Sequence, residues 1–231
     1  MSKHRLRDPP LNIKTMFQLK SISLLFSAAQ MLLPLMTAGD TMKNVAILLA
    51  PGFEEAEAIM VIDVLHRTKI NVTLLSCHDR LELHSYHNIR MFADALLERN
   101  MDRLFDAVVI PGGPQGTVNL AANPMVTEFI RRHDDAGKLI CPLCSAAARV
   151  LGGNHLLKGR HYVCSGDLWK DVADGVYVDQ KVVVDGNLIS GKGLGVAFDF
   201  AFTLASKLSD DKDDVNFQVE HIYYDYWRVP A

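Results

Sequence analysis

The sequence predicts an α/β fold in which a mainly parallel sheet is covered by helices on both faces. Short, continuous apolar runs alternate with segments of helical spacing, which is the order that βαβ units produce. The runs lack the polar alternation of a half-exposed strand, so both faces of each strand are expected to be buried. In such sheets, ligands bind beyond the carboxyl ends of the strands.

The first predicted strand is Val45–Ala50, an uninterrupted VAILLA run that ends at the turn residues Pro51 and Gly52. Apolar residues at helical spacing then predict a helix over Glu54–Arg67. Asn71–Ser76 is the second strand.

The middle of the chain repeats this order. Ala107–Ile110 is a predicted buried strand followed by a proline and two glycines. Pro124–Asp135 is a predicted helix, since proline suits the first helical turn. Leu139–Leu143 is the fourth strand. The remaining predicted elements are a helix over Ser145–Leu151 stopped by Gly152 and Gly153, a hairpin of Val182–Asp185 with Leu188–Ser190, and a final helix over Val196–Leu208.

Composition limits the class of protein. The chain has 231 residues, 49% of them hydrophobic and 22% charged, which is room for one globular domain and an appendage. A net charge of −3 without a basic stripe argues against a nucleic-acid partner. Four cysteines are too few for a disulfide scaffold, so reduced thiols and a cytoplasmic location are expected.

Residues 1–41 are predicted to be an N-terminal extension, and residues 42–231 a single domain. The extension joins basic residues to an apolar stretch over Ile22–Met36, which is the plan of a secretory signal peptide. The stretch is short and interrupted for a membrane span, and no membrane contact is expected for the folded domain. A start codon placed upstream of the true one at Met42 explains the same pattern. Export, a misplaced start and an anchor therefore stay open.

Cys144 ends the fourth predicted strand and opens a helix of small residues. The positive end of a helix favours the thiolate, and a tight strand-to-helix turn lifts the side chain out of the sheet, as in a nucleophile elbow. A buried, inert cysteine fits the same position, because free cysteines are often buried.

Glu57 is predicted to lie in the first turn of the first helix, in line with Val61 and Val64. This stripe faces the top of the sheet, so partial desolvation is expected to raise the pKa of the Glu57 carboxyl. A protonated Glu57 would donate a hydrogen bond to a thiolate or act as general acid and base. The alternative is an acid that complements the helix dipole, a role that suits Glu54 and Glu55 better.

Four segments together resemble the ThiJ/PfpI superfamily, in particular the branch of the Parkinson-disease protein deglycase and bacterial YajL. The resemblance implies a flavodoxin-like three-layer sandwich, a homodimer, and no metal or organic cofactor. By position it makes Cys144 the nucleophile, Glu57 its partner acid and Gly113 an oxyanion donor. The segments are VAILLAPGFEEAEA (45–58), FDAVVIPGGPQGTVNL (105–120), KLICPLCSAAARVLGG (138–153) and LISGKGLGVAFDFAFTL (188–204).

Two departures from the family pattern concern the site. Ser145 stands where the peptidase-like branch has a histidine after its cysteine, so proteolysis is not expected. The deglycase branch supplies a histidine from a later strand, and alignment places Cys164 there, with His161 three residues earlier. These two residues are the candidates for a second thiol or a base. His87 or Tyr86 takes the place of an arginine that some members direct at the cysteine.

Cys141 and Cys144 form a CxxC pair. Residues three apart on a strand point to opposite faces, so a disulfide between these two would need a sharp bend at Cys144, and Cys164 is the better resolving thiol. A zinc site is not expected, because the chain has one CxxC and it lies in a strand-to-helix turn.

Three functions follow from these residues. In a glyoxalase or deglycase, the Cys144 thiolate attacks a small dicarbonyl or its adduct on a protein, Glu57 shuttles the proton, and Gly113 with backbone near Ser145 holds the oxyanion. In a redox sensor or chaperone, Cys144 is oxidised without turnover. In a family member whose site has drifted, a dimeric binding protein remains.

Overall fold

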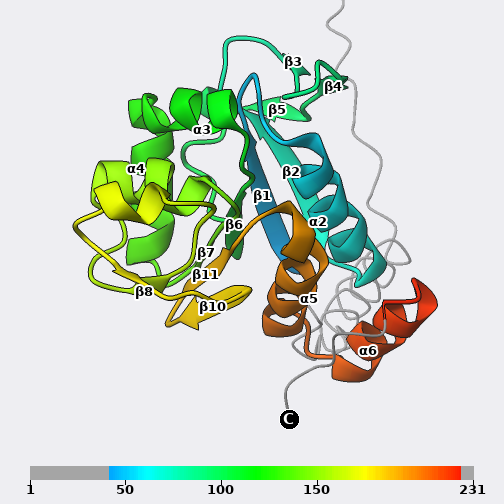
Figure 1. The fold of residues 1–231 in the computed structure, drawn as a ribbon. Helices are drawn as coiled ribbons and strands as arrows, with labels where there is room; N and C mark the ends of the chain where they lie inside the picture. The colour runs from blue at the N-terminus through cyan, green and yellow to red at the C-terminus, as the bar shows by residue number, and fades with distance from the viewer. Residues whose placement is uncertain (1–41, 225–231) are drawn as a thin grey trace, which may run out of the picture. The chain divides into compact units, whose positions relative to one another are not determined.

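The computed structural model describes residues 42–224, which build a seven-stranded sheet with helices on both faces (Figure 1). The spatial order of the strands is β10-β11-β7-β6-β1-β2-β5, and every neighbouring pair is parallel except β10 with β11. The strands are β1 (Asn44–Leu49), β2 (Asn71–Ser76), β5 (Ala95–Leu96), β6 (Ala107–Ile110), β7 (Leu139–Pro142), β10 (Val182–Asp185) and β11 (Leu188–Gly191).

The helices form the two outer layers. On one face α2 packs against α5, with α6 beside α5, and on the other face α3 packs against α4 (Figure 1). Side-chain caps begin three of them, since Glu54, Asn123 and Asp211 each accept a hydrogen bond from a backbone N–H of the first turn. The helices are α2 (Glu55–Arg67), α3 (Pro114–Ala121), α4 (Pro124–Asp135), α5 (Ala197–Leu208) and α6 (Lys212–His221).

The sheet separates two hydrophobic cores. Ile47 and Val109 face the core under α2 and α5, whereas their neighbours Leu48 and Val108 face the core under α3 and α4. All four side chains are fully buried. Strands buried on both faces have no solvent side, which explains the continuous apolar runs in the sequence. The predicted three-layer α/β sandwich is confirmed.

Most predicted elements are confirmed, and β2, β6, β10 and α4 have the predicted bounds residue for residue. The predicted C-terminal hairpin is the antiparallel pair β10 and β11, with Gly186 at φ 57° in its turn. The ends of the other predicted strands and of the first and final helices differ from the structure by one residue. Such shifts are ordinary, because end residues lack a full set of hydrogen bonds.

The predicted helix Ser145–Leu151 is wrong in type and in its end. The chain forms a π-helical turn over Ala147–Leu151 and continues as a 3₁₀ turn over Gly152–Asn154. Gly152 has helical backbone angles (φ −59°, ψ −45°), and the helical path ends only at His155, whose φ is 55°. Glycine allows a helix to end but does not force it to end. Placing the end of the predicted helix at Gly152 and Gly153 was therefore wrong.

Several short elements were not predicted. The main ones are a hairpin of β3 (Glu82–His84) with β4 (Arg90–Phe92), a two-stranded pair of β8 (His161–Tyr162) with β9 (Val176–Tyr177), and helices α3 and α6. Strands of two or three residues are too short to show a hydrophobic period, so the sequence held no signal for them.

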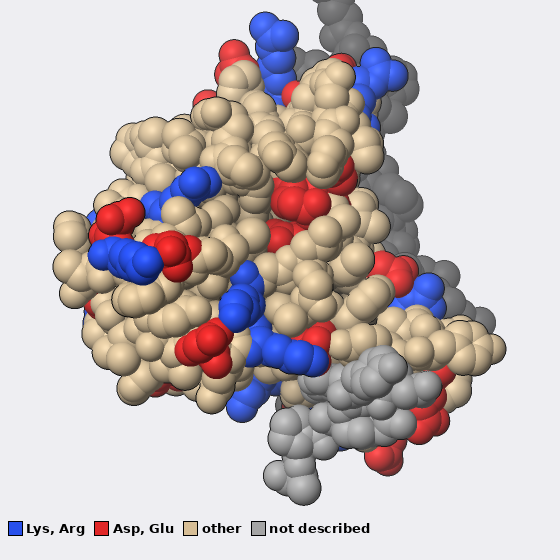
Figure 2. Space-filling view, viewed as in Figure 1, with Lys and Arg blue, Asp and Glu red and all other residues tan. Residues whose placement is uncertain are grey.

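The described surface carries small groups of both charges. Figure 2 shows them scattered over a mostly uncharged face, without an extended basic stripe there. Within residues 42–224, no helix is long and apolar enough to cross a bilayer. The predicted extension, residues 1–41, lies outside the described residues.

Candidate functional site

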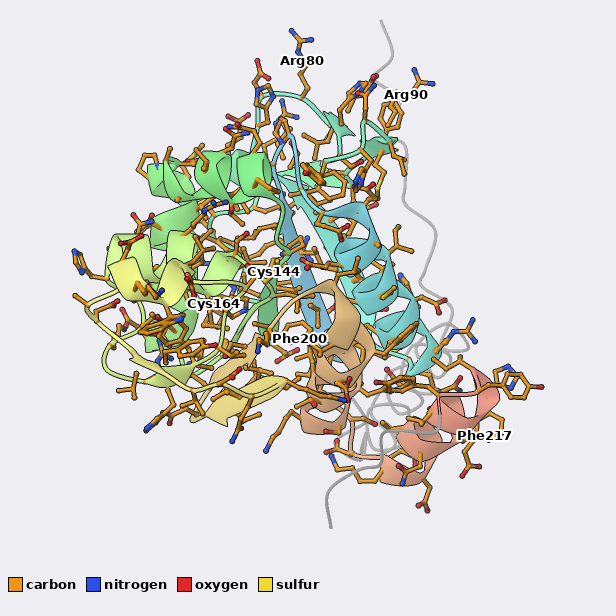
Figure 3. The ribbon with its side chains drawn as sticks, in the orientation of Figure 1. Arg80, Arg90, Cys144, Cys164, Phe200 and Phe217 are labelled. Atoms are coloured by element: carbon orange, nitrogen blue, oxygen red, sulfur yellow. The ribbon has the colours of Figure 1, made fainter. Side chains whose placement is uncertain are left out.

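The carboxyl ends of β1, β6 and β7 bring three separate segments of the sequence together. The turn after β1 leads into Glu57 on α2, the turn after β6 holds Gly112 and Gly113, and the turn after β7 holds Cys144. Figure 3 shows Cys144 between the two helical layers at this edge of the sheet. Parallel strands place their carboxyl ends at one edge, so the convergence follows from topology.

Cys144 lies in a left-handed backbone conformation, with φ at 60°. Its N–H donates to the Gly191 carbonyl at 2.9 Å, and its own carbonyl accepts from the Ser165 N–H at 3.2 Å. A non-glycine residue in this region is strained, and the hydrogen bonds on both sides hold it there. The side chain leaves the strand direction and is half buried at the mouth of a pocket. The predicted elbow is therefore present.

Glu57 is fully buried beside this cysteine. Its Oε2 accepts a hydrogen bond from the Gly112 N–H at 2.7 Å, and its carboxyl also hydrogen-bonds to the Cys144 thiol. Glu54 caps α2 by accepting from the Glu57 N–H at 2.6 Å, which fixes the backbone of the first turn. Burial raises the pKa of Glu57 to about 7, as the sequence predicts.

Gly112 lets the acid and the thiol meet. A Cβ on Gly112 would lie 2.6 Å from the Cys144 Cβ and 2.7 Å from the Glu57 Oε2, so no other residue fits. Gly113 has φ at 102°, and a Cβ there would lie 2.4 Å from the Gly52 carbonyl oxygen. No described residue accepts a hydrogen bond from the Gly113 N–H, which leaves it able to bind an oxyanion.

The expected lowering of the Cys144 pKa is wrong. Burial raises the pKa of the Cys144 thiol to about 11, and the negative charge of Glu57 adds to this effect. The Ser165 side chain and the Ser145 backbone N–H both hydrogen-bond to the sulfur and act in the opposite direction, but they are outweighed. Only a short π-helical turn follows Cys144, so no long helix dipole compensates for the desolvation. At neutral pH the resting thiol is protonated.

The Ser145 side chain turns away from the sulfur. Its Oγ lies 3.1 Å from the Thr117 Oγ1, and Thr117 in turn donates to the Gly113 carbonyl at 2.8 Å. Ser145 and Thr117 are both buried. This pair links the turn after β7 to α3. The side chain of Ser145 therefore has a structural role, while its backbone N–H hydrogen-bonds to the Cys144 sulfur.

A pocket of about 370 Å³ opens over Cys144. It is large enough for a small organic molecule and is bordered by both acidic and basic groups. Leu168 and Leu194 supply apolar surface to its lining. The lining residues are Glu54, Glu57, Tyr86, His87, Gly113, Pro114, Cys144, Ser145, Arg149, Ser165, Leu168 and Leu194.

His161 and Cys164, the candidates for a second base or thiol, do not line this pocket. His161 is exposed on β8 and pairs with Asp185 at 2.9 Å. Cys164 is fully buried in the core under α3 and α4, whereas Cys144 packs against the core under α2 and α5. The residue from this segment that reaches Cys144 is Ser165. The sequence alignment places the family histidine at Cys164, but the side chain that faces the sulfur belongs to the next residue, Ser165.

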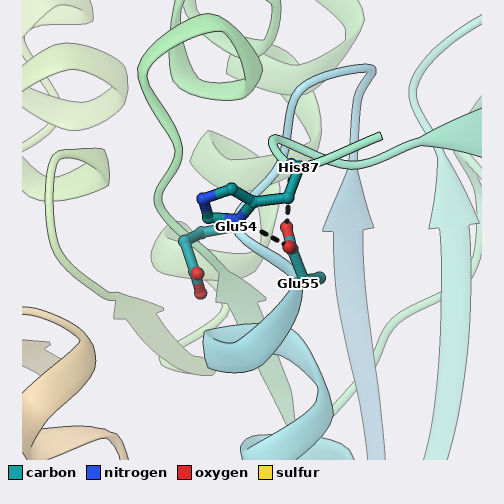
Figure 4. A group of neighbouring side chains, drawn as sticks. All are labelled: Glu54, Glu55 and His87. Atoms are coloured by element: carbon teal, nitrogen blue, oxygen red, sulfur yellow. Dashed lines mark hydrogen bonds and ion pairs between the residues drawn. The ribbon is translucent and has the colours of Figure 1, made fainter. Parts of the chain in front are cut away.

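His87 brings an imidazole to the pocket. Its Nδ1 lies 2.6 Å from Glu55 Oε1 (Figure 4). Although burial raises the pKa of Glu55, hydrogen bonds from its own backbone, Ser85 and His87 together hold that pKa below its usual range. Glu54, Glu55 and His87 are the described side chains that lie close enough to share a metal ion. The Glu54 carboxylate already caps α2 and Glu55 already binds His87, so we assign no metal or cofactor to them.

Sequence reasoning found Cys144, Glu57, Gly113 and Ser145, but it missed the functional positions of Ser165 and Arg149. Both side chains line the pocket. Arg149 lies five residues after Cys144, and a spacing of five carries it to the pocket only because the turn is helical. No sequence signal marked Ser165.

Known proteins share this fold and much of this sequence. The family model described as the DJ-1/PfpI family matches residues 43–207. A crystal structure of a DJ-1 superfamily protein from Salmonella typhimurium, with a cysteine-to-alanine substitution, is 63% identical, with a TM-score of 0.79, and the match covers 80% of this chain and all of that one.

Two curated relatives are informative. Protein DJ-1alpha of Drosophila melanogaster is 36% identical, over 72% of this chain and 77% of the relative. The glutathione-independent glyoxalase DJR-1.2 of Caenorhabditis elegans is 30% identical, over 72% of this chain and 89% of the relative. The chain spans only 37% and 42% of the length of Protein DJ-1 homologs B and A of Arabidopsis thaliana, which it matches at 29% identity.

The buried Glu57 predicts an unusual dependence of stability on pH. The native state holds the Glu57 proton up to about pH 7, whereas the unfolded chain releases it near the ordinary value of 4.5. The stabilisation from this proton is complete below the unfolded pKa and is lost as the pH rises through the folded one. Between pH 4.5 and 8, wild type should lose about 3 kcal/mol of unfolding free energy relative to Glu57→Gln, measured by urea denaturation.

Glu55→Gln is the matched control for this measurement. The pKa of Glu55 is lowered in the fold, so wild type should gain stability relative to Glu55→Gln as the pH rises. A difference between wild type and Glu57→Gln that does not change with pH would show that Glu57 titrates normally.

Proposed function

The chain belongs to the DJ-1/PfpI family, and on that premise we propose that it is a cysteine-dependent stress-protection enzyme acting on small dicarbonyls or on their protein adducts. One observation carries the proposal: the buried Glu57, with a pKa of about 7, hydrogen-bonds to the protonated Cys144 thiol inside a pocket. A base with a pKa near the working pH is well matched to removing a thiol proton. The nematode relative named as a glyoxalase supports the same chemistry.

The first chemical step joins the thiol to the substrate aldehyde. The Glu57 carboxylate takes the thiol proton while the sulfur bonds to the aldehyde carbon, so no resting thiolate is needed. The aldehyde oxygen becomes an oxyanion, which the Gly113 N–H is positioned to bind. Glu57, now protonated, returns the proton to this oxygen and leaves a hemithioacetal.

The following steps move two protons within the bound substrate and add one water. Glu57 removes the proton from the hemithioacetal carbon and delivers it to the neighbouring carbonyl carbon, while the hydroxyl proton passes to the neighbouring carbonyl oxygen. The reaction goes through an enediol and gives a 2-hydroxyacyl thioester on Cys144. Water then cleaves the thioester, releasing the 2-hydroxy acid and regenerating the thiol. Methylglyoxal and water thus give lactate, with no external oxidant, reductant or cofactor.

Purified protein incubated with methylglyoxal should form lactate, as followed by an enzymatic lactate assay. Cys144→Ala should abolish the flux, because it removes the atom that forms the covalent bond. Glu57→Gln should lower kcat by about 10²- to 10⁴-fold, the usual loss on removing a general base. For wild type, kcat/KM should rise through about pH 7 as Glu57 ionises. Equal flux from wild type and Cys144→Ala would disprove the proposal.

Oxidation of Cys144 is the second candidate function, and the donors around its sulfur favour it. The Ser165 side chain, the Ser145 N–H and a protonated Glu57 would each donate to the oxygens of a sulfinate. Glu57 takes the thiol proton as the sulfur takes an oxygen from peroxide, which gives a sulfenate and water, and a second peroxide gives the sulfinate and another water. Cys164 is an unsuitable resolving thiol, because it is fully buried in the other core.

Intact mass spectrometry after mild peroxide treatment tests this second candidate. We expect two added oxygen atoms on Cys144 and the same result in Cys164→Ser, since no resolving thiol takes part. Ser165→Ala should reduce the yield of sulfinate and favour further oxidation. Loss of two hydrogens with a Cys144–Cys164 crosslink would overturn the single-thiol form, and an unmodified Cys144 would remove the oxidation role.

The homodimer implied by the family and a cytoplasmic site of action complete the proposal. Large apolar side chains are exposed on the β3–β4 hairpin and on the adjoining helix α2, namely Ile59, Tyr86, Ile89 and Phe92. The hairpin is attached to the site, since the Tyr86 N–H donates to the Phe53 carbonyl at 2.7 Å. A second copy of the chain covering this surface would bury apolar area and stiffen a wall of the pocket.

Analytical ultracentrifugation tests the dimer. Phe92→Glu should shift the wild-type dimer toward monomer, because it places a charge in the proposed interface. Phe217→Glu is the matched control, since Phe217 is similarly exposed but lies on α6. A monomeric wild type, or an equal shift in both variants, would contradict this surface.

A further inference from the structure

Arg149 is a cation on the wall of the Cys144 pocket that the proposed reaction does not use. It belongs to the π-helical turn Ala147–Leu151 and lines the pocket together with Cys144 and Ser145. The steps above need a nucleophile, a base and an oxyanion donor, and Arg149 supplies none of these. Arg149 therefore lines the pocket without a part in the proposed reaction steps.

Hydrogen bonds hold the guanidinium in a fixed place. Its Nη1 donates to the Pro114 carbonyl at 3.1 Å and to Thr117 Oγ1 at 3.4 Å. Thr117 Oγ1 is itself 3.1 Å from Ser145 Oγ, next to the nucleophile in the chain. Two neutral anchors at one nitrogen thus fix the position of Arg149 relative to Cys144.

The charge of Arg149 has no partner among residues 42–224. No carboxylate in that range lies within 4 Å of its nitrogens, and its Nε and Nη2 donate to no described residue. By contrast, the side chains of Arg67, Arg131 and Arg160 each pair with an aspartate or glutamate. Among residues 42–224, Arg90, Arg103 and Arg132 also have no acid within 4 Å, but they do not line the pocket. A held guanidinium with unused donors matches the planar, two-oxygen geometry of a carboxylate.

The acids of the pocket are already engaged elsewhere. Glu54 accepts from the Glu57 N–H, and Glu57 accepts from the Gly112 N–H and contacts the thiol. Neither neutralises Arg149. An anionic group of a bound substrate would fill this role and would be held in the same pocket as the reacting sulfur.

From this we infer that Arg149 determines specificity by binding the carboxylate of a substrate that also carries the reactive dicarbonyl. The inference rests on the proposed function for its reaction. The substrate class is 2-oxoaldehydes that end in a carboxylate, of which 4,5-dioxopentanoate is the simplest well-matched member. The same steps convert it, with one water, to 2-hydroxyglutarate: sulfur adds to the aldehyde, one proton moves from C5 to C4 and another from the C5 oxygen to the C4 oxygen, and the thioester is hydrolysed.

The kinetic test compares 4,5-dioxopentanoate with uncharged methylglyoxal. Wild type should give the higher kcat/KM with the carboxylated substrate. The ratio of the two kcat/KM values should fall about 10- to 100-fold in Arg149→Gln, the range expected for hydrogen bonds to a charged group. Arg149→Lys keeps the charge but loses the planar pair of donors of the guanidinium. Its ratio of kcat/KM values should therefore lie between those of wild type and Arg149→Gln. Arg67→Gln removes a paired arginine at the far end of α2 and should leave the ratio unchanged.

A binding test separates this inference from the reaction. Cys144→Ala protein should bind 4-oxopentanoate, an unreactive carboxylated ketone, in isothermal titration calorimetry, and should bind its methyl ester much more weakly. The double variant Cys144→Ala/Arg149→Gln should lose the preference for the acid. If methylglyoxal is not converted but this preference holds, the reaction is wrong and the anion site stands. Equal binding of acid and ester, or an unchanged ratio in Arg149→Gln, would overturn the role of Arg149.

Discussion

The site depends on one contact, between a buried carboxyl and a thiol that meet at a glycine. Gly112 donates its N–H to Glu57 and has no room for a side chain beside Cys144. Burial moves the pKa of the acid up toward 7 and that of the thiol up to about 11. In this arrangement the acid is the group that changes its charge near neutrality, and the thiol loses its proton as it reacts.

The rest of the fold holds that contact in place. The Glu54 cap fixes the first turn of α2, and β11, which runs parallel to β7, provides the Gly191 carbonyl that accepts from the Cys144 N–H. Thr117 links α3 to Ser145 on the other side. The strained backbone at Cys144 is therefore supported by hydrogen bonds from both sides of the sheet. Such a rigid frame keeps Glu57 and Cys144 at the distance and orientation that proton transfer between them requires.

Electrostatics differ across the pocket. The acids that line it, Glu54 and Glu57, accept hydrogen bonds from backbone N–H groups, whereas the guanidinium of Arg149 is held only by neutral oxygens. A substrate with a polar end and a carbonyl end would be oriented by this asymmetry, whereas a symmetrical one would not. In the proposed reaction, Cys144 and Glu57 would therefore react with the substrate, and Arg149 would orient it.

The sequence by itself determined the layers, the long strands of the sheet and the pairing of Glu57 with Cys144. Strands β1 and β6 are buried on both faces and leave continuous apolar runs in the sequence, and Glu57 is conspicuous as an acid on an apolar stripe. The tertiary structure alone decided the pKa of Cys144, the exclusion of His161 and Cys164 from the pocket, and the arrival of Ser165 and Arg149. These depend on desolvation and on which side of a turn a residue faces. A shift of one residue turns a side chain to the opposite face, and the spacing of residues in the sequence does not determine which face that is.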